Sequence, residues 1–118
     1  MKDSVDRFLP LGPAMLHILL ALSGEGLHGY GIMQEVLRQT DSRYKLGPGT
    51  LYDNLQRLVK LKLVEEVAGD GDEESSRRRY YRLTALGRGV LAAEVTRLEG
   101  VIKTAKAHLK VLRPSLKA

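Results

Sequence analysis

Three glycines near the N-terminus have the spacing of a nucleotide-binding turn. Gly24, Gly26 and Gly29 form G-x-G-x-x-G within "SGEGLHGYGIMQEV". In a dinucleotide-binding fold, such glycines follow a strand and let the backbone approach a pyrophosphate at a helix N-terminus. Here the preceding residues 11–22 are mostly strong helix formers, and Ile18 is their only β-branched residue. We therefore expect a tight turn between two helices and no nucleotide site.

Residues 48–61 carry side chains suited to reading DNA. A helix that enters the major groove needs an apolar back and an outward face of short or polar side chains, so that its backbone can approach the bases. Pro48 suits the first turn of such a helix. The predicted apolar back consists of Leu51, Leu55, Leu58 and Val59. The other face is expected to show Thr50, Tyr52, Asp53, Asn54, Arg57 and Lys60. The candidate DNA contacts in this helix are Gly49, Thr50, Tyr52, Asn54 and Arg57.

Three of these residues are predicted to read bases. Asn54 can form two hydrogen bonds with adenine, and Arg57 can reach guanine or a phosphate. Thr50, like its neighbour Gly49, adds little bulk where the helix would enter the groove. An ordinary amphipathic surface helix is the alternative interpretation of this segment.

Basic and phenolic side chains outside this segment are candidates for phosphate contacts. They are Tyr30, Lys45, Arg77, Arg78 and Arg79. The three adjacent arginines follow an acidic stretch, "DGDEE", which starts at Asp70. They either bind the sugar-phosphate backbone or are neutralised by these acids in solution. The tyrosines at positions 44, 80 and 81 are expected to pack inside the protein.

Composition and charge exclude several classes of protein. The chain of 118 residues is long enough for one core, and it contains no cysteine, which excludes disulfides and thiolate metal sites and fits a reducing cytoplasm. The net charge is +5, yet residues 1–99 carry 14 basic and 14 acidic side chains, so the whole excess lies in the tail. The histidines at positions 17, 28 and 108 lie far apart, and no nucleophile motif is present. We expect no metal, no cofactor and no enzymatic activity.

The hydropathy pattern predicts the elements that position these residues. Helices are expected over residues 11–22, 31–40 and 48–61. Residues 63–67 and 77–84 read as two strands of a hairpin, and Thr84 is placed to cap the next helix. This order predicts a mainly α protein with a small β-hairpin, a winged helix-turn-helix followed by a long C-terminal helix. The expected domains are residues 1–84, which bind DNA, and residues 85–118, which form a dimerisation helix and a basic tail.

The C-terminal helix predicts a second subunit. Apolar residues recur from Leu91 to Leu112 at alternating spacings of four and three, and the small domain has little surface left to cover them. The helix over residues 11–22 is apolar on every side, which also suggests a partner. We expect Pro114 to end the last helix. The predicted dimer contacts are Leu16, Leu19, Leu20, Leu91, Val95, Leu98, Ile102 and Leu109.

Three motifs in combination resemble the PadR family of bacterial transcriptional regulators. They are H-G-Y from His28, G-T-L-Y from Gly49, and R-Y-Y-x-L-T-x-x-G from Arg79, and the resemblance covers roughly residues 9–92. It implies a winged helix-turn-helix dimer that binds a palindromic operator, usually as a repressor. By position, Gly49, Thr50 and Tyr52 match the recognition helix, and residues 79–84 match the second strand of the wing. Some members release DNA when a small planar aromatic effector binds between the subunits. This chain has no Trp and one Phe to stack on such an effector.

The sequence thus predicts a cytoplasmic, homodimeric, sequence-specific DNA-binding regulator that represses a palindromic operator. The alternative is a winged-helix module that binds protein partners and no DNA, because one fold serves many functions. The balanced charge of residues 1–99 favours this alternative slightly. Salt dependence separates the two, because contacts with phosphates weaken steeply as salt rises.

Overall fold

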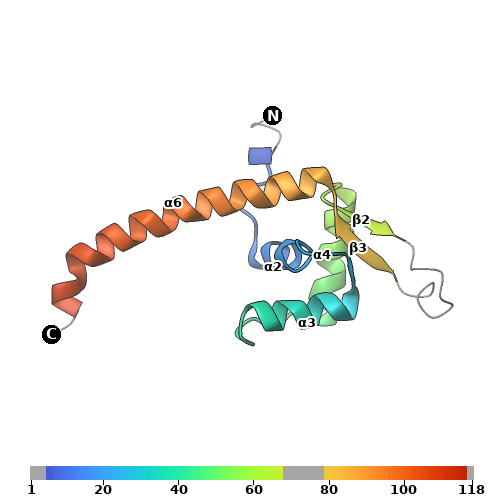
Figure 1. Cartoon of the computed structure of the whole chain (residues 1–118), viewed down its shortest axis with the longest axis horizontal. Coiled ribbons are helices and arrows are strands. Elements are labelled where there is room, and N and C mark those ends of the chain that lie inside the picture. The colour runs from blue at the N-terminus through green and yellow to red at the C-terminus, as the bar shows by residue number, and fades with distance from the viewer. Residues whose placement is uncertain (1–4, 68–78, 117–118) are drawn as a thin grey trace.

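The computed structural model describes residues 5–67 and 79–116, with side chains up to residue 110. The described elements follow the order α2 (Pro13–Ala21), β1 (Leu27–His28), α3 (Gly29–Gln39), α4 (Pro48–Lys60), β2 (Val64–Val67), β3 (Tyr80–Leu83) and α6 (Ala85–Leu116). Helices α2, α3 and α4 form a body with the small sheet at one end, and α6 crosses the body and extends beyond it (Figure 1). This is the predicted winged helix-turn-helix with a long C-terminal helix.

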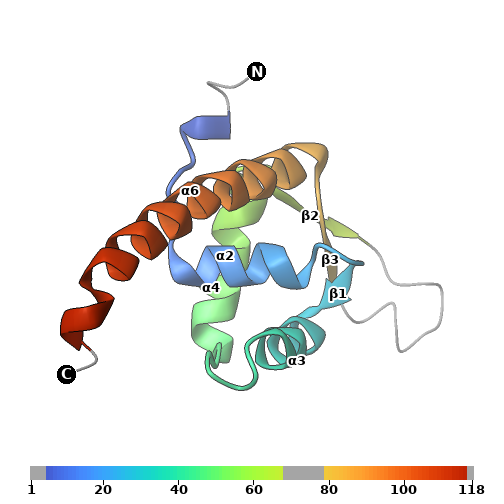
Figure 2. The same cartoon turned by 60° about the vertical axis from the view of Figure 1, so that its left-hand side comes forward.

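Helix α2 lies at the centre of the body and packs against α3, α4 and α6 (Figure 2). Its apolar composition on all sides follows from this position, because three neighbouring helices cover different faces. Pro13 stands in the first turn, as predicted. Ile18 and Leu19 are fully buried in a core shared with Ile32, Leu51 and Leu63.

Helices α3 and α4 each bury one face. The Nδ1 atom of His28 accepts a hydrogen bond from the backbone N–H of Gly31 at 3.0 Å, and this cap starts α3 two residues before the predicted position. In α4, Leu51, Leu55 and Leu58 are buried as predicted. The prediction for Val59 was wrong: its side chain is 37% exposed, since it stands at the edge of the apolar face.

The sheet has three antiparallel strands in the order β1-β3-β2. The sequence predicted only the β2–β3 hairpin. Leu27 and His28 add a third strand by pairing with Tyr81 and Tyr80 of β3. In β3, Tyr81 and Leu83 face the core at 7% exposure each, as the alternating pattern predicted.

Helix α6 has 32 residues and begins directly after Thr84. The Oγ1 atom of Thr84 accepts a hydrogen bond from the N–H of Gly87 at 2.9 Å, so the predicted cap is confirmed. Pro114 does not end the helix, which continues to Leu116. A proline this close to a helix end disrupts few main-chain hydrogen bonds. No helix in residues 5–67 or 79–116 is both long and apolar enough to cross a bilayer.

A buried carboxylate joins the first half of α6 to the segment before α2. Glu94 is 1% exposed. Its Oε2 atom accepts a hydrogen bond from the backbone N–H of Leu11 at 2.9 Å and another from Nη2 of Arg97 at 3.1 Å. The hydrogen bond from Arg97 is the main reason why the pKa of Glu94 lies below its ordinary value. The contacts hold α6 and the start of α2 in a defined relative position.

Candidate nucleic-acid interface

The outward face of α4 is polar along its whole length. At 100° per residue, the positions opposite the buried leucines are Gly49, Asp53, Gln56 and Lys60. All four are exposed. Thr50 and Arg57 flank this stripe on one side, Tyr52 flanks it on the other, and all three are exposed too. The buried back fixes α4 to the body, and the outward face is open to a ligand as large as a duplex.

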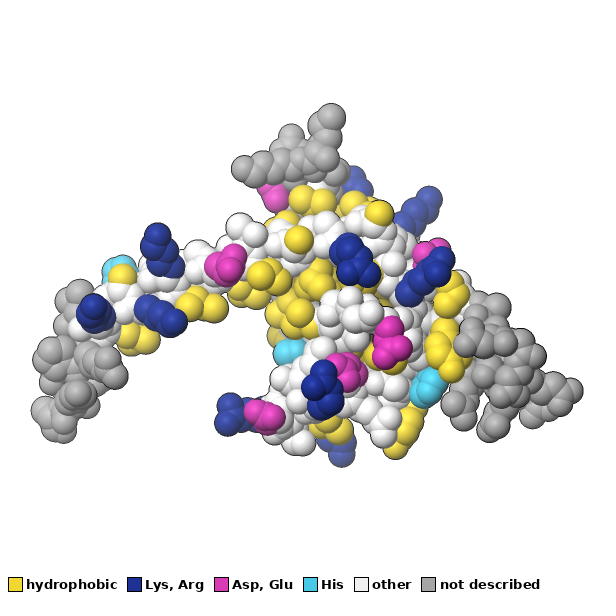
Figure 3. Space-filling model, viewed as in Figure 1, with side chains coloured by type: hydrophobic (Ala, Val, Ile, Leu, Met, Phe, Trp, Pro, Cys, Tyr) yellow, Lys and Arg dark blue, Asp and Glu magenta, His cyan; other side chains and the backbone are white. Residues whose placement is uncertain are grey.

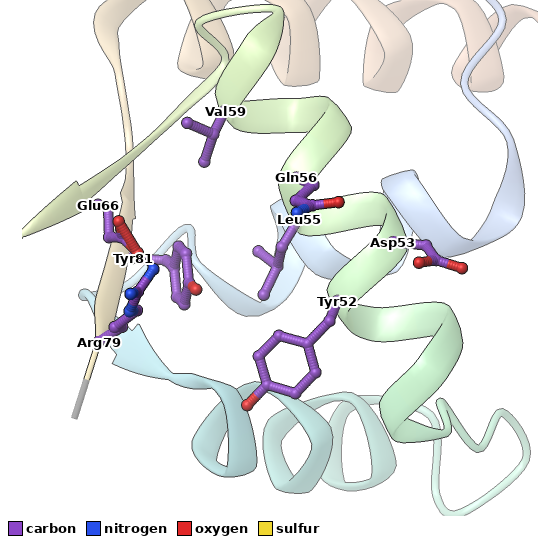
Figure 4. Close-up of a pocket in the computed structure, with 8 residues that line it drawn as sticks. All are labelled: Tyr52, Asp53, Leu55, Gln56, Val59, Glu66, Arg79 and Tyr81. Atoms are coloured by element: carbon purple, nitrogen blue, oxygen red, sulfur yellow. Dashed lines mark hydrogen bonds and ion pairs between the residues drawn. The ribbon is translucent and has the colours of Figure 1, made fainter. Parts of the chain in front are cut away.

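Tyr52 extends from α4 toward the first turn of α3 (Figure 4). An added Cβ at Gly29 would lie only 2.1 Å from the Tyr52 hydroxyl oxygen, so glycine is required for this close approach. The next residue, Tyr30, is 63% exposed, and Tyr52 is 48% exposed. The two phenols thus lie at the start of α3, where backbone N–H groups and the helix dipole favour an anion.

A cavity of about 530 Å³ lies between part of α4 and the sheet. Tyr52 and Leu55 line one side, and Glu66, Arg79 and Tyr81 line the other (Figure 4). Arg79 pairs with Glu66 at 3.1 Å while its own side chain stays 77% exposed. Burial is the main cause that raises the pKa of the Tyr81 hydroxyl, which stays neutral at physiological pH. The cavity therefore carries charge of both signs, with Arg79 at its mouth.

The structure distributes the other predicted DNA contacts over the same surface and its margins. Lys45 is exposed in the loop before α4. Asn54 is half-buried. Its side-chain amide lies along the helix, because the Nδ2 atom donates a hydrogen bond to the carbonyl oxygen of Thr50 at 2.8 Å. Arg77 and Arg78 lie outside the described residues.

Asp53 and Lys60 were expected on the outward face but were not named as DNA contacts, and Gln56 was missed there. Their signal was present in the spacing, since they lie two and five residues from buried leucines and close to 180° around the helix. The predicted DNA contacts follow the hydrogen-bonding ability of the side chains more than their angular position on the helix.

The predicted dimer contacts divide into two groups. Leu19 and Leu91 are buried in the subunit's own core, at 0% and 7% exposure, and offer almost no surface to a partner. Leu16, Leu20 and Leu98 are partly buried. The open apolar residues on α6 are Val95, Val101, Ile102 and Leu109, each 41–54% exposed. Figure 3 shows hydrophobic side chains along one edge of α6 that continue onto the adjoining body.

His17 and His28 have packing and capping roles in the described part of the chain. His17 stacks on Tyr44 with ring centroids 4.5 Å apart, which matches the expected packing role of Tyr44. His28 caps α3 and meets the edge of the Tyr80 ring at 5.4 Å. In residues 5–67 and 79–110, no group of three His, Asp or Glu side chains has the geometry of a metal site.

Comparison with known proteins identifies the family. The model of the family described as "Transcriptional regulator PadR-like family" matches residues 18–93. These residues cover the core, the sheet and the start of α6. The chain belongs to the PadR family. It is therefore a transcriptional regulator and not an enzyme.

Individual relatives of this PadR-like chain agree in sequence and in fold. It is 37% identical to the transcriptional regulator Rv3488 of Mycobacterium tuberculosis over 86 residues, which cover 71% of this chain and 74% of that protein. A PadR family regulator from Clostridium difficile superimposes with a TM-score of 0.71 at 24% identity, over 83% of this chain and 99% of that one. Bacillus subtilis PadR in complex with operator DNA superimposes with a TM-score of 0.63 at 19% identity, over 73% of this chain and 47% of that one.

Proposed function

We propose that this PadR-like chain is a cytoplasmic homodimer that binds a palindromic operator and represses transcription by occluding a promoter. The observation that carries the proposal is the outward face of α4, which is polar and exposed while its back is buried. A helix of this kind fits the major groove, which is about 12 Å wide. The similarity to a PadR protein seen with operator DNA supports the same assignment.

The residues of α4 and its neighbours suit two roles in DNA binding, which are close approach to the bases and contact with the phosphates. Gly49 and Thr50 keep the N-terminal turn slim, so that α4 can approach the bases. Around it, phosphates would be held by the exposed side chains of the neighbouring elements and by the arginines of the wing. These phosphate contacts are Tyr30, Lys45, Tyr52, Arg57, Arg77, Arg78 and Arg79.

A second copy of the chain supplies the other half of the interface. Residues 99–110 of α6 are exposed throughout the monomer. A helical segment without tertiary packing is marginal in water, because propensity alone barely compensates for its ordering entropy. Pairing of the apolar edge of α6 with a partner covers Val95, Ile102 and Leu109. A two-fold axis then presents two α4 helices to successive major grooves, about 34 Å apart. A small aromatic effector between the subunits stays a prediction of the family resemblance.

A salt titration with a matched pair of variants tests the DNA-binding role. For the wild-type chain, the logarithm of the duplex affinity should fall linearly with the logarithm of the salt concentration. Arg57→Ala should weaken binding to all duplexes and flatten the slope by about one unit. Arg88→Ala removes an exposed basic side chain at the start of α6 and serves as the control. Its duplex affinity and the slope of its salt dependence should equal those of the wild-type chain. Salt-independent binding, or none, would contradict the proposal and favour a module for protein partners.

A further inference from the structure

Asp53 and Gln56 stand at the centre of the outward face of α4. Both are exposed; Asp53 lies nearly opposite the buried Leu55, and Gln56 lies nearly opposite the buried Leu58. In the part of the chain whose side chains are described, no hydrogen bond or ion pair engages either residue. Their polar atoms are therefore available to a ligand that approaches α4 from outside.

Helix stability does not account for the acidic residue at this position. Asp53 is the sixth residue of α4, and the first turn, where the helix dipole favours acids, contains none. Arg57 follows four residues later, at a spacing that favours an ion pair on a helix surface. Yet Asp53 and Arg57 do not pair within 4 Å in the structure. The carboxylate thus has no partner that the protein itself supplies in the described region.

A carboxylate in the middle of a DNA-facing surface carries a definite chemical requirement. It repels phosphates, so it lowers the affinity for DNA in general. It gains a hydrogen bond where a base edge presents an amino group, and cytosine N4 is the donor that Asp and Glu characteristically recognise in the major groove. The neighbouring Gln56 can form two hydrogen bonds with adenine, through its N6 and N7 atoms. The acid therefore selects among duplexes and does not hold them.

We infer that Asp53 and Gln56 are the specificity-determining residues of α4, with Asp53 reading a cytosine and Gln56 an adenine. This inference rests on the proposed DNA-binding function. It moves base reading away from Asn54, whose side-chain amide already donates to the carbonyl of Thr50 and which stands nearer the buried face. Arg57 and Lys60 then supply the counter-charge on either side of Asp53.

The assignment has an unusual consequence for a variant that lacks the carboxylate. Asp53→Ala removes the repulsion of phosphates, so its affinity for random duplex DNA rises. The same change removes the hydrogen bond from cytosine N4 to the carboxylate, so the variant distinguishes cytosine from the other bases less well. Higher general affinity together with lower selectivity is the opposite of what the loss of a phosphate contact produces.

Selection of binding sites from a random duplex pool tests the inference. The wild-type chain should enrich a half-site with one fixed cytosine and one fixed adenine. In competition assays, Asp53→Ala should lose at least fivefold of its preference for that cytosine and bind random DNA more tightly. Gln56→Ala should lose a similar preference for the adenine. Asn54→Ala tests the competing base reader that the sequence favoured on the same helix and should keep both preferences.

The outcomes separate this inference from the function on which it rests. If the wild-type chain enriches no sequence, both are overturned. If it enriches a site whose cytosine preference survives in Asp53→Ala, or is lost in Asn54→Ala, the base-reading assignment alone is overturned.

Discussion

Glu94 shows how a single side chain links two segments that lie far apart in the sequence. It is the only buried charged residue among the described side chains, and it connects α6 to the start of α2 through Leu11. Burial of a carboxylate is unfavourable unless partners satisfy its oxygens, and Arg97 and the Leu11 N–H both do so. These contacts tie the first half of α6 to the segment before α2.

Glu94→Gln should lower the free energy of unfolding by about 1.5–3 kcal/mol at neutral pH, because it removes a hydrogen bond between charged groups. The pKa of Glu94 is lowered in the folded state, so its stabilisation is present above the ordinary value of about 4.5 and is lost as pH falls through the folded-state pKa. Urea unfolding at a series of pH values should show a smaller acid-side loss of stability in Glu94→Gln than in the wild-type chain, because Glu35, whose pKa is also lowered, remains in both. Glu99→Gln changes an exposed acid on the same helix and is the control. A variant as stable as wild type throughout would contradict this role.

At the residue scale, the sequence predicted the burial or exposure of most side chains whose environment depends on local periodicity. Leu51, Leu55 and Leu58 are buried because they share one face of a helix. The role of Glu94 was not foreseeable, since its partner Leu11 lies 83 residues away. The position of Asp53 was readable from its spacing, but the sequence could not show that it lacks an ion pair with Arg57.

At the scale of elements, two glycines set how closely the secondary structures approach. A Cβ at Gly29 would meet the hydroxyl of Tyr52, at the end of a half-exposed side chain. A Cβ at Gly87 would lie 1.9 Å from the backbone oxygen of Leu63. This oxygen accepts a hydrogen bond from the N–H of Thr84 at 3.1 Å, so it cannot move without disturbing the contact between the start of β2 and the start of α6. The same chemical change therefore has different consequences at the two sites.

Gly29→Ala should displace Tyr52 and weaken DNA binding about fivefold, the equivalent of one hydrogen bond of about 1 kcal/mol, while the free energy of unfolding changes by less than about 1 kcal/mol. The effect should not add to that of Tyr52→Phe in a double-mutant cycle, because both changes remove the same hydroxyl contact. Gly87→Ala should instead destabilise the fold by about 1–3 kcal/mol or more. Fully additive losses at Gly29 and Tyr52 would show that they act independently.

The elements themselves follow from sequence where they are long or strongly periodic. Helix α4 and the β2–β3 hairpin were predicted within a few residues. Strand β1 was missed, because two residues cannot show an alternating pattern and it forms only by pairing with the distant β3. The predicted end of α6 was wrong by two residues. Proline was expected to end the helix at position 114, but helix ends are uncertain by one or two residues and α6 continues to Leu116.

At the scale of the whole molecule, α6 makes the chain elongated. The principal extents are 61, 35 and 22 Å, and the far half of α6 lies outside the body (Figure 1). The apolar residues on this half predicted a second subunit from sequence alone. The sequence could not show which of the predicted contacts, such as Leu19, the monomer already buries.

Ile102→Glu should convert the proposed dimer to a monomer in sedimentation analysis, because it places a charge in the centre of the apolar edge of α6. Ile102 is 50% exposed in the monomer, so the body should remain folded, as circular dichroism would report. Lys103→Glu changes the charge of the adjacent exposed residue, which lies about 100° around the helix from Ile102, and should leave the proposed dimer intact. A dimeric Ile102→Glu would place the interface elsewhere.

The central claim is that two α4 helices on one dimer read one duplex. Hydroxyl-radical footprinting of the wild-type chain on a duplex enriched from a random pool tests it most directly. The account predicts two protected stretches, centred about one helical turn apart and related by an inverted repeat. A single protected stretch, two stretches without two-fold symmetry, or uniform cleavage along the duplex would contradict it.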